Sequence, residues 1–177
     1  MGGEQMQPIK VALILCSCFF AYGTYWSDWA FDYYLLWANS AEHPNAVSRA
    51  VQYYLTQTQA PNILKYIPLA NLFIAAVGFS AGLAHMTDAN LLFDGASLVL
   101  MLFALSTHAT SVRPGLDTIV SSKEEDALAA AVKNIAAAHF IIVLAVTGII
   151  GLQIAHYFVI RKSSSERVAV NANKKKQ

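Results

Sequence analysis

The sequence predicts an all-α membrane protein with four transmembrane helices. The first observation behind this prediction is a run of 27 residues, 134–160, that contains no Lys, Arg, Asp or Glu. A helix of that length, at about 1.5 Å per residue, reaches about 40 Å and exceeds the bilayer hydrocarbon core of about 30 Å. The second is composition, since 56% of the residues are hydrophobic and 13% are charged, which is about half the charged share of soluble proteins.

The first span is predicted over about residues 10–27, because residues 11–27 carry no charge. That run is just long enough to cross a bilayer. Tyr and Trp residues typical of a membrane interface occur at its end, and no small-residue cleavage site is evident. We therefore interpret it as a retained span rather than a cleaved signal peptide.

A long loop is predicted next, over residues 28–61. Its aromatic segment, residues 31–37, is too apolar for an ordinary solvated loop and holds Asp32 among its rings. After Pro44, apolar residues recur at helical spacing, so this loop should contain a short amphipathic helix. Such a helix would lie on the membrane surface or cover the ends of the spans.

The second and third spans are predicted over about residues 64–87 and 91–112. The second span contains Gly78-Phe-Ser-Ala-Gly82, a spacing of small residues that lets helix backbones approach closely. The third span should end at Arg113-Pro114-Gly115, because proline lacks an N–H and disfavours helix at the residue before it.

The fourth span is predicted over about residues 132–160, and the alanine-rich run from Asp126 to Ala138 should lead into it as one helix. Together the four spans make a membrane domain over residues 1–160. A basic tail over residues 161–177 follows it.

Charge distribution predicts the orientation in the membrane. The tail holds six Lys or Arg residues and one acid, whereas residues 28–61 hold three acids and one Arg, and residues 113–133 hold four acids and three bases. Positive residues flanking a span favour the cytosolic side. We therefore expect cytosolic N- and C-termini and two lumenal loops that contain short helical pieces.

Several functional classes find no support in the sequence. The basic residues are confined to the tail, so nucleic-acid binding is not indicated. The two cysteines, Cys16 and Cys18, lie together in an apolar run, which is too few for a disulfide scaffold or a zinc site. No nucleophile elbow, phosphate-binding loop or zinc-protease motif occurs, so we predict no catalytic residue, metal or cofactor.

Ionisable residues at membrane depth are functional candidates. Asp94 is expected to favour the N-terminus of the third helix electrostatically, with pairing to a client or to His85 as the alternative. His85 and His156 fall towards the cytosolic side, and His108 and His139 towards the lumenal side. Two stacked haem sites would need facing imidazole pairs, so we favour interfacial or internally hydrogen-bonded histidines.

Five ordered segments carry a resemblance to a known family. In this order they are similar to the fungal packaging chaperones of amino-acid permeases, which are membrane proteins of the endoplasmic reticulum, and the resemblance covers roughly residues 15–157. The segments are Phe31-Asp32-Tyr33-Tyr34-Leu35-Leu36-Trp37, Phe93-Asp94-Gly95-Ala96-Ser97-Leu98, Val112-Arg113-Pro114-Gly115-Leu116-Asp117, Asn134-Ile135-Ala136-Ala137-Ala138-His139 and Gly151-Leu152-Gln153.

The resemblance implies a non-enzymatic protein that shields newly made permeases from aggregation and supports their export to the cell surface in coated vesicles. Its partners would be permeases as transient clients, vesicle-coat components and membrane lipid. The candidate contacts with clients, or within the bundle, are Phe31, Asp32, Tyr34, Trp37, Gly78, Gly82, Asp94 and Gly95.

The end of the chain resembles a dilysine retrieval signal for the endoplasmic reticulum, because Lys174 and Lys175 occupy the fourth and third positions from the C-terminus. A solvated basic tail is the alternative. Family members can carry a longer charged tail that engages the vesicle coat, so the short tail leaves that contact open. Two other functions also remain open, namely a structural subunit of a larger membrane complex and a small four-span enzyme that handles haem or sterol.

Overall fold

A computed structural model describes residues 2–39, 41–84 and 88–174, and every regular element in them is a helix. Four helical stretches are long and apolar enough to cross a membrane, so the predicted all-α, four-span fold is confirmed. These stretches lie in α1 (Gly2–Leu36), in α3 (Asn62–Ala84), in the joined helices α4 (Asp88–Thr107), η1 (His108–Val112) and α5 (Arg113–Ser121), and in α6 (Glu125–Lys174).

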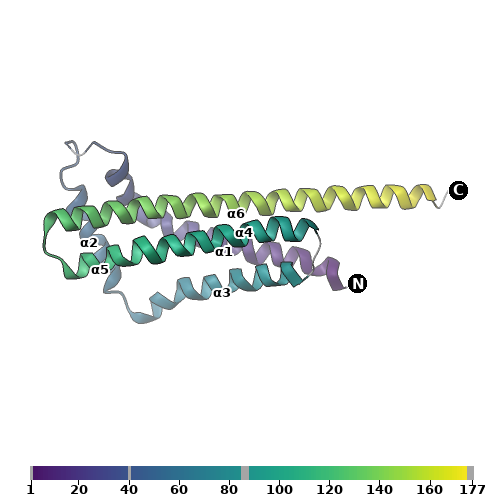
Figure 1. Ribbon diagram of the computed structural model, residues 1–177, viewed down its shortest axis with the longest axis horizontal. Helices are drawn as coiled ribbons and strands as arrows, with labels where there is room; N and C mark the ends of the chain where they lie inside the picture. Colours follow the sequence, from purple (N-terminus) through teal and green to yellow (C-terminus); the bar gives the residue numbers. More distant parts are fainter. Residues whose placement is uncertain (1, 40, 85–87, 175–177) are drawn as a thin grey trace.

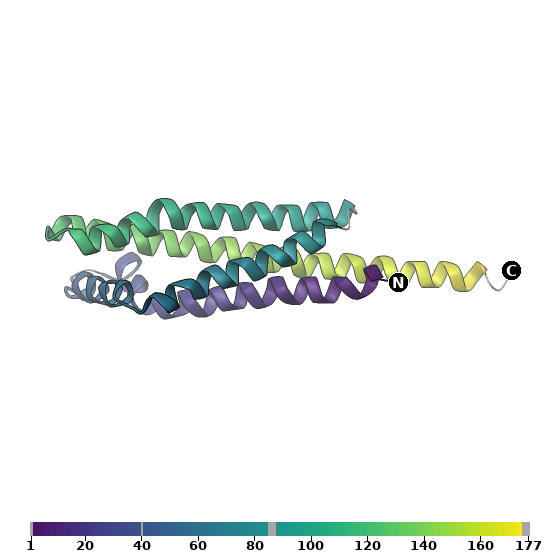
Figure 2. The ribbon, with the colours of Figure 1, turned by 90° about the horizontal axis from the view of Figure 1, so that it is seen from below.

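The four long helices run alongside one another, with both chain ends at one end of the bundle and α2 (Ala46–Thr58) at the other (Figure 1). Helix α6 packs against both α1 and α4, and α3 packs mainly against α1. Figure 2 shows that α3 lies beside α1 near the α2 end and meets α4 only near the opposite end. Helices α3 and α4 therefore diverge towards the α2 end.

Helix α1 continues well past the predicted span. It runs to Leu36, so the expectation of a loop over residues 28–61 is wrong for its first nine residues. No Gly or Pro interrupts residues 24–43, and the aromatic residues there pack on other helices, which stabilises the extra turns. The aromatic segment is therefore the end of a helix rather than a loop.

The predicted amphipathic helix is confirmed as α2. Its Ala50 and Tyr54 are buried, and it packs against α1, α5 and α6. Of the two expected placements, α2 takes the second and covers the ends of the long helices. This position brings its tyrosines over buried polar groups of α1 and α6.

The helix of the third span does not end at the proline, so the predicted end of that helix is wrong. The chain continues through the π-helical turn η1 directly into α5, where Pro114 lies in the first turn. The Arg113 N–H donates to the His108 carbonyl in the five-residue pattern of a π-helix. Proline is tolerated there because a first-turn N–H needs no partner within the helix.

Helix α6 confirms the prediction that the alanine-rich run continues into the fourth span. It contains 50 residues, which corresponds to about 75 Å at about 1.5 Å per residue. The helix extends beyond Arg161, so residues 161–174 of the predicted tail are helical. Lys175 lies outside the described residues.

Some glycines on the long helices are packing positions and others are open. A Cβ atom on Gly78 would lie 2.8 Å from a side-chain carbon of Ile14 on α1, and one on Gly148 would lie 2.9 Å from Leu100 on α4. By contrast, a Cβ atom on Gly23, Gly95 or Gly151 would meet no atom within 4 Å. These three glycines present open backbone faces.

Candidate functional site: two buried polar clusters

Buried polar side chains gather in two clusters, one at each end of the bundle. We call the group beneath α2 the aspartate–tyrosine cluster, and it consists of Asp28, Asp32, Tyr53, Tyr54, Gln57 and His139. We call the group near the chain ends the lysine–aspartate hub, and it consists of Lys10, Asp94, Ser97, Gln153 and His156.

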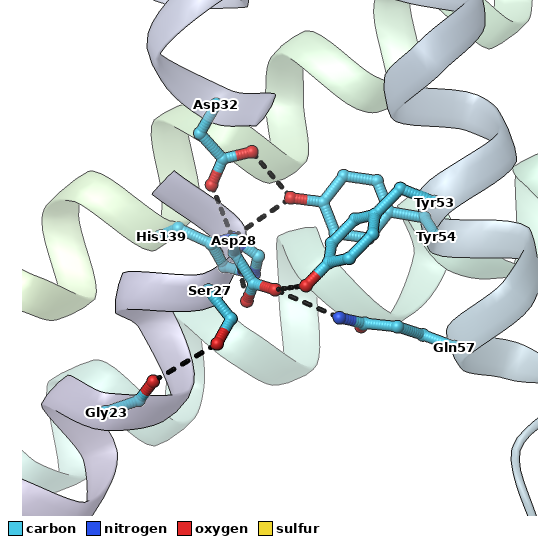
Figure 3. Close-up of polar contacts among 8 residues, drawn as sticks. All are labelled: Gly23, Ser27, Asp28, Asp32, Tyr53, Tyr54, Gln57 and His139. Carbon is cyan, nitrogen blue, oxygen red and sulfur yellow. Dashed lines mark hydrogen bonds and ion pairs between the residues drawn. The ribbon is translucent and has the colours of Figure 1, made fainter. Parts of the chain in front are cut away.

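Two aspartates one turn apart on α1 organise the aspartate–tyrosine cluster (Figure 3). The Tyr53 hydroxyl donates to Asp28 Oδ1 at 2.7 Å, and Gln57 Nε2 donates to the same oxygen at 3.0 Å. The Tyr54 hydroxyl donates to Asp32 Oδ1 at 2.5 Å, and His139 Nδ1 of α6 lies 2.8 Å from Asp32 Oδ2. The cluster therefore joins α1, α2 and α6.

The two tyrosines of α2 stay protonated and act as donors. Burial, the hydrogen bond to Asp28 and the charge of Asp28 raise the pKa of Tyr53. Burial and the neighbouring Asp32 carboxylate raise the pKa of Tyr54 still further. A higher pKa keeps each hydroxyl neutral at every physiological pH, so neither bond to an aspartate is lost by ionisation of the phenol.

The aromatic segment divides between two faces of α1. Phe31 stacks on Tyr53 with ring centroids 4.0 Å apart, and Arg49 of α2 lies 5.9 Å above the rings of both Phe31 and Tyr34. On the other face, Trp37 lies 5.0 Å from Trp29 and 5.2 Å from Phe140 of α6. Trp37 is 48% exposed, so it is a surface ring and not a buried one.

An ion pair forms the centre of the lysine–aspartate hub. Lys10 Nζ of α1 lies 2.7 Å from Asp94 Oδ2 of α4, and the two side chains are 2% and 0% exposed. From α6, Gln153 Nε2 donates to Asp94 Oδ1 and to Ser97 Oγ, each at 3.1 Å. A buried charge pair needs such extra hydrogen bonds to offset the cost of leaving water.

Helix α3, which carries the second span, reaches the hub through Gly82. A Cβ atom on Gly82 would overlap the Asp94 carboxylate and the Lys10 stem. Asn90 Nδ2 of α4 also donates to the Gly82 carbonyl at 3.3 Å. All four long helices therefore meet at the hub, and the absence of a side chain at Gly82 makes room for it.

The spacing of the two clusters matches the thickness of a membrane. Lys10 and Asp28 lie 18 residues apart on α1, which is about 27 Å at about 1.5 Å per residue. The hydrocarbon core is about 30 Å thick. Each cluster would therefore lie near one boundary of that core. There it joins the helices, while the part of the bundle between the two clusters stays apolar.

The structure places the predicted site residues in different surroundings. Asp32 lies in the aspartate–tyrosine cluster and Asp94 in the hub, while Gly78 and Gly82 are packing positions. We expected Asp94 to favour the N-terminus of its helix electrostatically, and the structure shows in addition that Lys10 and Gln153 bind its carboxylate. His85 lies outside the described residues.

Other cluster members are not evident as site residues from the sequence. In the sequence, Lys10 stands at the polar start of the first span, and Tyr54 is only one residue of an apolar stripe. A signal for Tyr54 exists, because a tyrosine on the buried face of a helix needs a hydrogen-bond partner for its hydroxyl. For Lys10 there is no local signal, since Asp94 lies 84 residues further along the chain.

The described histidines of the two clusters contact protein groups. His139 is hydrogen-bonded to Asp32 and makes a tilted contact with the Tyr25 ring, and the His156 ring stacks on Phe93 with centroids 5.0 Å apart. Within the described part of the chain, no three His, Cys, Asp or Glu side chains are grouped to hold a metal ion. The internally hydrogen-bonded interpretation therefore fits His139, which joins α6 to α1, whereas neither ring nitrogen of the buried His156 has a hydrogen-bond partner in the described part of the chain.

No curated protein and no solved structure matches the chain. A family of chaperones described as "ER membrane protein SH3" matches residues 5–177, which is nearly the whole sequence. This match agrees with the resemblance carried by the five ordered segments and with the four membrane-spanning helices. The chain therefore belongs to the SHR3 chaperone family of multi-pass membrane proteins of the endoplasmic reticulum.

Proposed function

We propose that this chaperone of the endoplasmic reticulum binds newly made amino-acid permeases, shields their spans from aggregation and supports their export to the cell surface. The family match supports the chaperone role. The permease as client rests on the resemblance noted in the sequence. A chaperone family implies a non-enzymatic protein, which argues against a haem- or sterol-handling enzyme.

One structural observation carries the proposal, namely that almost all of the described chain belongs to the four-helix bundle. Outside the long helices the structure describes only α2 and short connections, and α2 is itself packed on the bundle. A chaperone built in this way would meet its clients through the bilayer or at its two ends. Clients with many spans suit such a surface better than water-soluble domains do.

Permeases need this kind of help because their spans carry polar groups meant for their own interior. Before the bundle of a permease closes, those groups face lipid without hydrogen-bond partners. Each unpaired group then costs roughly several kcal/mol of free energy, as an unpaired polar group does in any apolar surrounding. The chaperone exposes many apolar side chains and the open faces of Gly95 and Gly151. Transient packing on these faces would keep an unfinished client from packing on another copy.

Affinity capture in a mild detergent tests the proposal. We expect several different permeases to be recovered in amounts well below that of the chaperone, and mostly as newly made, pulse-labelled protein. Capture of one partner at a constant ratio in both new and old protein would instead identify a structural subunit of a larger complex.

The orientation of the chaperone is part of the proposal, with both termini in the cytosol. Glycosylation acceptor sites placed in the connection around Glu42 and in the connection around Lys123 are expected to be modified in microsomes, because both would face the lumen. An acceptor site added after Gln177 is the control and should stay unmodified. The reverse pattern would overturn the orientation.

The two lysines near the C-terminus are proposed to retain the protein in the early secretory pathway. Replacing Lys174 and Lys175 by serine is expected to let a measurable fraction reach later compartments, detected by cell fractionation. The control variant, Arg167→Ser with Lys176→Ser, removes the same charge but keeps both lysines in position. Equal distributions of the two variants would mean that retention depends on net charge or on the spans.

A further inference from the structure

A lateral groove lies between the two polar clusters, at the depth of the hydrocarbon core. It has a volume of about 310 Å³ and is lined by α1, α3, α4 and α6. On α1 it extends from Ile14 to Tyr25, which is about 16 Å at about 1.5 Å per residue. Ile14 is one turn from Lys10 of the hub, and the Tyr25 ring contacts His139 of the other cluster.

The groove is lined by residues of both α3 and α4, the two helices that diverge towards the α2 end (Figure 2). Its floor includes the small side chains of Cys18, Ala21, Ala75 and Ala104, together with larger buried side chains such as Ile14, Phe79 and Ile142. Its rims carry the large exposed side chains of Phe20, Leu69 and Leu105. Small floor residues let another helix backbone approach closely, as at helix interfaces in membranes.

His108 lies at the end of the groove nearest α2. Its side chain is exposed and makes no hydrogen bond or ion pair within the described part of the chain. It completes the stripe Met101, Ala104, Leu105 and His108, which faces the groove at helical spacing. The π-helical turn η1 begins at this residue, and such turns in α-helices frequently occur at functional sites.

We propose that the groove binds one transmembrane helix of a client and that His108 pairs with a polar side chain of that helix. At this depth the possible occupants are lipid chains and protein helices. A lipid chain offers no partner to an imidazole, whereas a client helix that carries a carboxylate, hydroxyl or amide does. This assignment rests on the proposed chaperone function and identifies the groove as the place where a client binds.

Photo-crosslinking tests the assignment on the full chain in phosphatidylcholine vesicles. A benzoyl-phenylalanine at Leu105 on the groove rim is compared with one at Leu102, an exposed position of the same helix that does not line the groove. The probe is a designed transmembrane helix of Leu and Ala with one Asp placed off centre, at the depth of His108, and an all-apolar version of it is the reference.

We expect the Asp-containing helix to be captured at Leu105 several-fold more than at Leu102, and several-fold more than the apolar helix. His108→Phe, a change at an exposed position, should abolish the preference for the Asp-containing helix while the purified protein melts normally. Equal capture at the two positions, adducts with lipid alone, or an unchanged preference in His108→Phe would each overturn the assignment.

A parallel assay separates this inference from the proposed function. Permease maturation is measured in cells that carry the wild-type chain, the His108→Phe variant or no chain. If maturation needs the chain but not His108, the chaperone function stands and the groove assignment fails. If maturation is normal without the chain, the permease proposal fails, and the vesicle experiment still reports on the groove.

Discussion

Replacing Lys10 with methionine is expected to destabilise the four-helix bundle more than any other single substitution in the two polar clusters. Methionine fills a similar volume but carries no charge. The Asp94 carboxylate, which is 0% exposed and lies among four helices, would therefore stay buried without its cation. Removing one partner of a buried ion pair typically costs about 3–5 kcal/mol. The thermal unfolding midpoint in detergent should fall sharply, and the amount of protein in cells should fall with it.

Two further variants make this prediction specific to the ion pair. Lys133→Met removes a lysine from an exposed position of α6 and should leave the midpoint nearly unchanged. The double variant Lys10→Met with Asp94→Asn removes both charges and should recover much of the loss. If Lys10→Met melts like the wild type, the hub does not hold the bundle together.

Replacing Asp32 with asparagine is expected to produce the second-largest loss of stability. The change keeps the volume but removes the charge that accepts from Tyr54 and pairs with His139, at a position only 1% exposed. Hydrogen bonds to charged groups contribute about 1.5–3 kcal/mol. The midpoint should therefore fall, and permease delivery to the cell surface should fall in proportion.

This variant also separates a structural role of Asp32 from direct contact with clients. A structural role predicts that stability and permease delivery are lost together, as in Tyr54→Phe, which removes the hydroxyl bonded to the same carboxylate. Asp117→Asn, at an exposed position of α5, is the control and should change neither property. Normal melting of Asp32→Asn with permeases aggregated in the endoplasmic reticulum would contradict the structural role.

Hydrophobic length and local periodicity predicted most of the fold. The run over residues 134–160 and the apolar stripe of α2 follow from the residues themselves, so α6 and α2 could be predicted. The end of α1 could not be predicted, because residues 28–36 are helical through packing of their rings on α2 and α6. Pro114 was expected to end the helix of the third span. The π-helical turn before it lets the helix continue instead.

The polar clusters were less accessible to prediction than the helices. Asp32 and Asp94 stood out because a carboxylate in an apolar setting is costly and therefore noticeable. Their partners Tyr54, His139, Lys10 and Gln153 depend on which helix faces which, and they lie between 22 and 107 residues away. Such pairings follow from tertiary packing, which the local pattern of a single sequence does not predict.

The most direct test of the central claim is the state of a permease made in the absence of this protein. An amino-acid permease is translated into microsomes that contain or lack the chaperone, and its aggregation is measured by native electrophoresis. The account predicts that the permease inserts equally in both but aggregates where the chaperone is missing, and that adding the chaperone back during translation prevents this. Equal aggregation in the two preparations would contradict the account.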